Sequence, residues 1–158
     1  MKKINLSKLR WIKVIRDLDK WAYTPAHLSK MSHYVLDQNG VTIFPLGFRR
    51  EPAKNIEAED EMALIQNGKL THIVQILDND YYSGGDWFHR LVKVIWWKPD
   101  LKNWEEILPQ SDFLGFDPAL QDGDPHEIIN LKRFREKWDS SGGLEGFQNY
   151  IAEKLYNS

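Results

Sequence analysis

The first hydrophobic pattern along the chain has the period of a helix. In residues 7–21 the apolar side chains fall within one half of a helical wheel, and charged side chains fill the other half. Ser7 stands where an N-cap residue would begin such a helix. We therefore predict a helix over residues 8–21. A short strand around residues 11–15 is the alternative, because that stretch is rich in β-forming residues.

The middle of the chain has the pattern of strands joined by tight turns. Asn39-Gly40 lies between the apolar runs 33–37 and 41–44, and Asn67-Gly68 lies between 62–66 and 69–77. Asn-Gly between apolar runs indicates a hairpin, since both residues tolerate positive φ. The sequence therefore predicts two β-hairpins.

Residues 87–97 have the alternation of one long strand that ends before Pro99. Successive side chains of a strand point to opposite faces, so every second residue here is expected on one face. That face carries Phe88, Arg90, Val92, Val94 and Trp96.

Residues 99–127 are acidic and rich in turn-forming residues, with eight Asp or Glu against Lys102 as the one basic residue. We expect surface loops there, without a bound metal. Asp124 and Pro125 have the order of an N-cap and a first helical position, which predicts a helix from there to Trp138. A shorter helix capped by Asn130 is the alternative.

After the turn-forming residues 140–143, apolar residues at helical spacing predict a last helix. Gly146 weakens that helix by about 1 kcal/mol relative to Ala. Hairpins in the middle and helices at both ends predict an α+β fold of one domain over residues 1–158, built on an antiparallel sheet or small barrel. A parallel sheet is not expected, because no helix separates the central strands.

Composition excludes several classes of function. The chain has no cysteine, which excludes disulfides, thiolate metal sites and thiol nucleophiles. It has neither a signal-peptide pattern nor a run of apolar residues long enough to span a membrane, so we expect a cytoplasmic protein with no membrane partner.

Enzyme motifs are also missing, and the sequence favours a binding protein over an enzyme. There is no glycine-rich phosphate loop, no nucleophile elbow and no metal-ligand spacing among the five histidines. Asp100-Leu101-Lys102, with Asp86 upstream, has the acid-x-Lys form of metal-dependent nucleases. It follows Pro99, however, where such a site would need a strand. We therefore expect no catalytic residues, no metal and no cofactor.

Charge is distributed unevenly. Residues 1–54 carry eleven basic and four acidic residues, and the rest of the chain carries ten and nineteen. Such a pattern is typical of a local anion-binding face, or of two oppositely charged faces that keep the protein in solution. Within the basic part, Arg49 and Arg50 follow Phe48, and paired arginines beside an aromatic ring can bind phosphate while a base stacks on the ring. A solvated loop is the alternative reading.

Residues 49–77 resemble the EVE branch of PUA-like domains. The resemblance lies in Ala53-Lys54-Asn55, in Glu59-Asp60 at the place of a Gly-Asp turn, and in a strand over residues 71–77. It implies a small pseudobarrel whose cleft accepts a base, often a modified one, flipped out of DNA or RNA.

The residues that this resemblance proposes for a base-binding site are of three kinds: aromatic walls, phosphate-binding arginines and polar contacts. They are Trp21, Tyr23 and Phe48, then Arg49 and Arg50, then Asn55 and His72. A protein-interaction module is the alternative, and it would use exposed tryptophans or the acidic residues 99–127.

Overall fold

The computed structural model describes residues 4–17, 19–31, 36–49, 55–79, 82–84 and 87–157. They form an α+β fold around one mixed sheet, so the predicted fold class is confirmed. The strand order is β2-β3-β7-β5-β4-β1-β8, with β6 also paired to β7. Within the described residues β2 and β8 end this order without pairing to each other, so the sheet is open and not a closed barrel.

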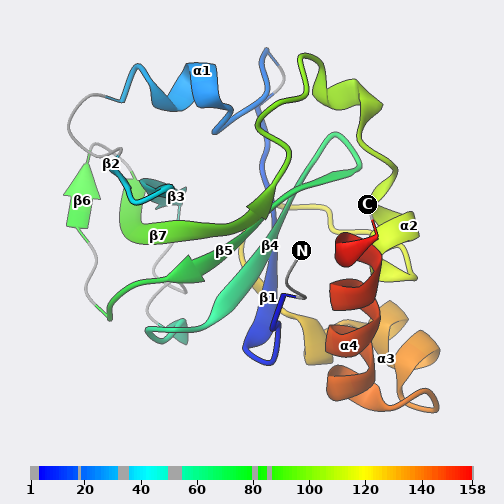
Figure 1. Ribbon diagram of the computed structural model, residues 1–158. Helices are drawn as coiled ribbons and strands as arrows, with labels where there is room; N and C mark the ends of the chain where they lie inside the picture. The colour runs from blue at the N-terminus through cyan, green and yellow to red at the C-terminus, as the bar shows by residue number, and fades with distance from the viewer. Residues whose placement is uncertain are drawn as a thin grey trace.

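The elements have the following bounds. The strands are β1 Leu9–Val14, β2 Leu36–Gln38, β3 Val41–Phe48, β4 Glu61–Gln66, β5 Lys69–Ile76, β6 Tyr82–Gly84, β7 Trp87–Trp97 and β8 His126–Glu127. The helices are α1 Pro25–Leu28, η2 Trp104–Glu106, α2 Gln110–Leu114, η3 Ile128–Asn130, α3 Lys132–Trp138 and α4 Gly143–Tyr156. Figure 1 shows α2, α3 and α4 gathered on one side of the sheet, with α1 apart from them.

Both predicted hairpins are confirmed over the described residues, whereas residues 33–35 of the first predicted strand lie outside them. β2 pairs antiparallel with β3, and β4 pairs antiparallel with β5. All four turn residues have positive φ: 56° at Asn39, 81° at Gly40, 50° at Asn67 and 74° at Gly68. Two consecutive left-handed residues give the turn that matches the twist of a hairpin, which explains why Asn-Gly occurs at both places.

The predicted N-terminal helix is wrong, and the alternative strand is correct. β1 lies between β4, to which it is parallel, and β8, to which it is antiparallel. Both edges of β1 are therefore paired, and both of its faces are also covered, with Trp11 in one core and Ile12 in the other. A short strand that is buried on both sides has apolar residues in succession, which resembles a helical pattern. The β1–β4 pair also corrects the expectation of a wholly antiparallel sheet.

The strand predicted over residues 87–97 is confirmed, but Trp96 does not share the face of Val92. Val74 pairs with Val94 and Ile73 pairs with Trp96, so Ile95 is an extra residue on β7. Such a bulge reverses the alternation beyond it. Val92 and Trp96 consequently lie in different cores.

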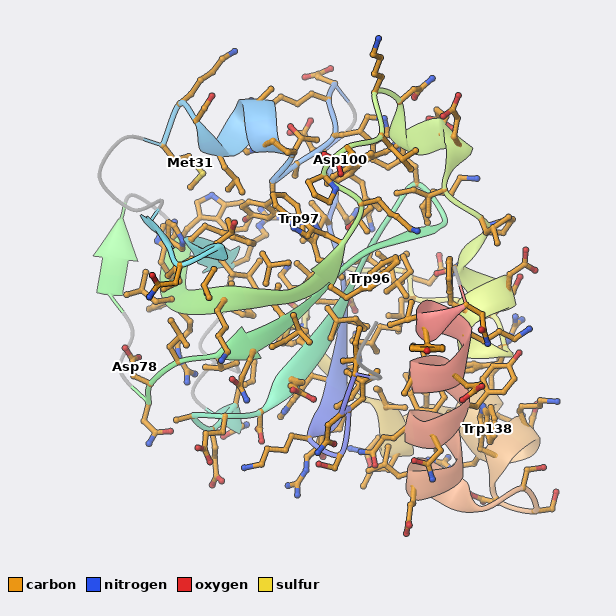
Figure 2. The ribbon with its side chains drawn as sticks, in the orientation of Figure 1. Met31, Asp78, Trp96, Trp97, Asp100 and Trp138 are labelled. Carbon is orange, nitrogen blue, oxygen red and sulfur yellow. The ribbon has the colours of Figure 1, made fainter. Side chains whose placement is uncertain are left out.

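The two cores lie on opposite faces of the sheet. The helix-side core contains Trp96 and Ile12 from the sheet, packed with Phe134 and Trp138 of α3 and Phe147 of α4. Figure 2 shows Trp96 on the side of the sheet that faces α4.

The second core lies on the α1 side of the sheet. It contains Trp11, Phe44, Phe48 and Val92 from the strands and Leu28 from α1. We refer to it as the α1-side core. It supports the functional site described below.

The C-terminal third differs from prediction in two places. The helix expected from Asp124 is wrong, because His126 and Glu127 form β8 beside β1 and the helix α3 begins only at Lys132. The start of α3 is close to that of the shorter helix, capped by Asn130, which the sequence also allowed. The N-cap residue is Leu131, however, and not Asn130. The last helix is confirmed as α4, with Phe147, Ile151 and Leu155 buried.

Residues 99–127 consist mainly of loops and short turns, as expected, but they do not all lie on the surface. Trp104, Phe113, Leu114 and Phe116 are buried in the helix-side core. The acidic residues of this segment stay largely outside while its apolar residues anchor it. Among the described residues, no helix has the length and hydrophobicity needed to cross a membrane.

Candidate functional site

A cleft with a volume of about 460 Å³ opens between the segment that follows β1, the end of β3 and the start of β7. Its lining includes basic, acidic and aromatic side chains. The lining residues are Lys13, Ile15, Arg16, Asp17, Asp19, Ala22, Tyr23, His27, Gly47 and Trp87.

Tyr23 fixes the position of the segment between β1 and α1. Its backbone has φ 59°, a left-handed conformation that is uncommon outside glycine. Its ring stacks on Phe44 of β3 at 4.5 Å between centroids, and its hydroxyl accepts a hydrogen bond from the Gly47 N–H at 3.3 Å. Tyr23 therefore joins this segment to β3 at the wall of the cleft.

His27 lines the cleft beside Tyr23. Its ring stacks on that of Tyr23 with 5.6 Å between centroids, and its Nδ1 accepts the Tyr23 N–H at 2.8 Å. Thr24, the N-cap of α1, accepts the His27 N–H at 3.1 Å. Burial, with a smaller effect of Lys20, lowers the pKa of His27 below its ordinary value.

His72 lies behind Tyr23 and is fully buried. Its Nε2 is 3.0 Å from the Tyr23 carbonyl oxygen, and its Nδ1 is 2.8 Å from Thr71 Oγ1. Burial lowers the pKa of His72 to about 4, so the ring is neutral near pH 7. It supports Tyr23 from behind and does not line the cleft.

Lys13 and Arg16 form the basic side of the cleft. The Lys13 side chain is almost fully buried, and its Nζ donates to the Gly123 carbonyl at 2.5 Å and lies 5.6 Å from the centroid of the Phe48 ring. Arg16 donates to the Gln121 carbonyl. Burial lowers the pKa of Lys13 to about 8, against the opposing effect of Asp124 and Asp122.

Trp87 provides an exposed aromatic surface at the rim. Its exposed fraction is 43%, the largest among the tryptophans of the described residues. A Cβ added at Gly47 would be 3.4 Å from the Trp87 ring, so this glycine lets the ring lie close against β3. The Arg49 guanidinium lies over this ring, with its Cζ 5.8 Å from the ring centroid. A flat ring with an adjacent cation is a suitable surface for stacking a base.

Four of the seven residues proposed from the sequence lie in or next to this cleft. Tyr23 lines it, Arg49 contacts Trp87 at its rim, Phe48 lies beneath Lys13, and His72 supports Tyr23. Phe48 is fully buried, so it cannot be the stacking wall that the sequence suggested.

Two of the other three residues lie away from the cleft. Trp21 packs edge-on against Trp104 at 6.1 Å and lines a separate cavity. Asn55 is exposed and is not among the residues that line the cleft. The third, Arg50, lies outside the described residues.

Sequence reasoning missed Lys13, Arg16, His27 and Trp87. Lys13 and Arg16 were assigned to the solvent face of a helix that does not exist, so no signal placed them together with Tyr23. The seven tryptophans gave no indication that Trp87 would be the exposed one.

The acid-x-Lys pattern lies away from the cleft. Asp100 and Lys102 line the cavity of Trp21, and Asp86 is outside the described residues. Across the ranges that the structure describes, no three His, Asp or Glu side chains are grouped so that they could hold a metal ion.

No protein family model, curated protein or solved structure matches this chain.

Proposed function

We propose that the protein is a binding module for nucleic acid, and that its cleft receives the base of an unpaired or flipped nucleotide of DNA or RNA. The observation that carries this proposal is the position of the exposed Trp87 ring. The ring lines the cleft together with Lys13 and Arg16, and the cation of Arg49 lies over it.

Stacking and charge both support this function. A base can stack on Trp87 because every base has a π-face, and such stacking tolerates different sequences. Cations beside the stacking surface can neutralise the phosphate of the same nucleotide. The volume of about 460 Å³ is within the range of about 300–1,000 Å³ that is usual for ligand pockets.

The proposal includes the resemblance of residues 49–77 to EVE-type PUA-like domains and the reading of a modified base. The supporting feature is a cleft at the end of β3, the strand that ends at Phe48 and precedes Arg49. The predicted strand over residues 71–77 corresponds to β5.

The test is a fluorescence titration of single-stranded oligonucleotides, plain and with modified bases, at low salt. Trp87→Ala is expected to weaken binding by about fivefold or more, because one stacked base contributes about 1–3 kcal/mol. Tyr156→Ala is the matched control, since Tyr156 is an aromatic residue of similar exposure, 39%, on α4. It is expected to bind like the unchanged protein.

Two results would contradict the proposal. One is the absence of binding to any oligonucleotide at low salt. The other is an equal effect of Trp87→Ala and Tyr156→Ala, which would mean that the cleft is not the binding site. Either result would favour a protein-interaction module with Trp87 as its exposed apolar contact.

A further inference from the structure

A chain of hydrogen bonds leads from the buried strand β5 to the cleft. It begins at Thr71, passes through His72 to the Tyr23 carbonyl, and continues from the Tyr23 N–H to His27. All three links are 2.8–3.0 Å long. Each of the two histidines in this series of hydrogen bonds contacts a backbone group of Tyr23 that can act only as a donor or only as an acceptor.

The Tyr23 carbonyl can only accept, so the His72 nitrogen that faces it, Nε2, carries a hydrogen. His72 is neutral and therefore has no second hydrogen, which makes its Nδ1 the acceptor of the Thr71 hydroxyl. Thr71 has one hydroxyl hydrogen, and the 2.8 Å contact to His72 uses it in preference to the 3.3 Å contact to the Leu64 carbonyl.

The same reasoning fixes His27. The Tyr23 N–H can only donate, so His27 Nδ1 is an acceptor without a hydrogen, and the hydrogen of the neutral ring is on Nε2. The two ring nitrogens lie on opposite edges, so Nε2 is directed away from the Tyr23 backbone. Protonation of Nδ1 would place two donors, the Nδ1–H and the Tyr23 N–H, against each other. The charged groups that act on this ring are Lys20, Asp17 and Lys30.

The other polar groups of the cleft include both donors and acceptors. Lys13 and Arg16 are donors, and they also donate to the Gly123 and Gln121 carbonyls. The carboxylates of Asp17 and Asp19 are acceptors, and Asp17 Oδ1 accepts from the backbone N–H groups of Asp19 and Lys20. A base that supplies acceptors is complementary to the donor part of this lining, to which the His27 Nε2–H belongs.

We propose that His27 is a specificity-determining residue whose Nε2–H selects nucleobases with an oxo group over the corresponding bases with an amino group. This inference rests on the proposed function of the cleft. An oxo group accepts the hydrogen bond, whereas an amino group at the same position presents a second donor and leaves both unpaired. The discrimination is thus built into the fold through Tyr23 and does not depend on the ligand's charge.

The first experiment observes the tautomer in the free protein. Nitrogen NMR at pH 7 is expected to show both His27 and His72 as neutral rings with the hydrogen on Nε2. A hydrogen on Nδ1 of His27, or a charged ring, would overturn the inference and leave the proposed function intact.

The second experiment compares matched nucleotides by calorimetry: uridine against cytidine monophosphate, and inosine against adenosine monophosphate. The oxo member of each pair is expected to bind about fivefold more tightly, which is the effect of one hydrogen bond. Equal affinity within both pairs would overturn the inference alone. No binding of any nucleotide would also overturn the inference, and the oligonucleotide titration then decides separately whether the proposed function fails as well.

Two variants of His27 separate its two nitrogens. The amide of Asn reaches the position of Nδ1, and the longer amide of Gln reaches that of Nε2. His27→Asn can still accept the Tyr23 N–H but has no donor at the position of Nε2, so its preference for oxo bases is expected to disappear. His27→Gln keeps a donor at that position but is not held by Tyr23 and can also present its amide oxygen, so it is expected to keep part of the preference. The opposite order would overturn the inference, and a merely structural role would not separate the two variants.

Discussion

Glu61, at the start of β4, carries a carboxyl group in a place where burial opposes its charge. The residue is 5% exposed, and burial raises its pKa to about 7, against the effect of a Lys8 backbone hydrogen bond and of the Lys8 and Lys93 charges. The folded protein therefore holds a proton on Glu61 that the unfolded chain releases near pH 4.5. Stability linked to this group is present below pH 4.5 and is lost as the pH rises through 7.

We therefore predict that Glu61→Gln raises the melting temperature at pH 8 and leaves it nearly unchanged at pH 5. Thermal melts followed by circular dichroism from pH 4.5 to 9 test this. Glu59→Gln is the control. The contact with Lys8 lowers the pKa of Glu59, so removing the Glu59 carboxylate is not expected to stabilise the protein at high pH. A melting temperature of Glu61→Gln that falls at pH 8 would show that the charged carboxylate stabilises the fold.

At the scale of single elements, α4 contains a glycine that helix propensity alone disfavours. Ala in place of a mid-helix Gly usually stabilises a helix by about 1 kcal/mol. A Cβ at Gly146, however, would lie 2.4 Å from the Ser141 carbonyl oxygen, which is backbone and cannot move aside. The turn before α4 therefore requires glycine at this position.

Gly146→Ala is consequently expected to lower the free energy of unfolding by at least about 1 kcal/mol, as overpacking usually does. Asn149→Ala, at an exposed position of α4, is expected to raise it by a few tenths of a kcal/mol. Urea denaturation measures both. If Gly146→Ala stabilised the protein as much as Asn149→Ala, the close approach of Ser141 would have no energetic role.

Local patterns predicted the elements whose determinants are local. The hairpins followed from Asn39-Gly40 and Asn67-Gly68, and α4 followed from its apolar stripe. β1 was not predictable in the same way, because its conformation depends on β4 and β8, which are distant in the sequence. The candidate site shows the same difficulty. Tyr23 and Arg49 were proposed from residue type and the family resemblance, whereas Lys13 and Trp87 became candidates only through the pairing of strands.

At the scale of the whole molecule, the charge of residues 1–54 gives a quantitative expectation for binding. Each phosphate contact releases counterions, so log affinity should fall linearly with log salt by about 0.7–0.9 per contact. Arg49 lies at the rim of the cleft, and Arg50 follows it in the sequence. Changing both to Ala is expected to weaken binding and to flatten the slope by up to about two units.

Titrations at several salt concentrations measure this slope, and Arg133→Ala is the matched control. Arg133 is an exposed arginine of α3 that pairs with Asp117, and neither residue lines the cleft. A slope that stays unchanged in the double variant would mean that phosphate is bound elsewhere. A preference for a modified base should largely survive the loss of both arginines, since the cleft itself reads the base.

The position of β1 between β4 and β8 has a consequence for how the chain acquires its structure during synthesis. β1 is synthesised before the two strands that pair with it. β4 follows about fifty residues later, and β8 is present only once residues 126–127 have been added. Until then both edges of an apolar strand are open to other chains, which is a condition that favours aggregation. Completion of the sheet is therefore a late event, dominated by contacts between distant parts of the chain, and such topologies fold slowly. In a cell, β1 would be the segment that most needs a chaperone while translation continues.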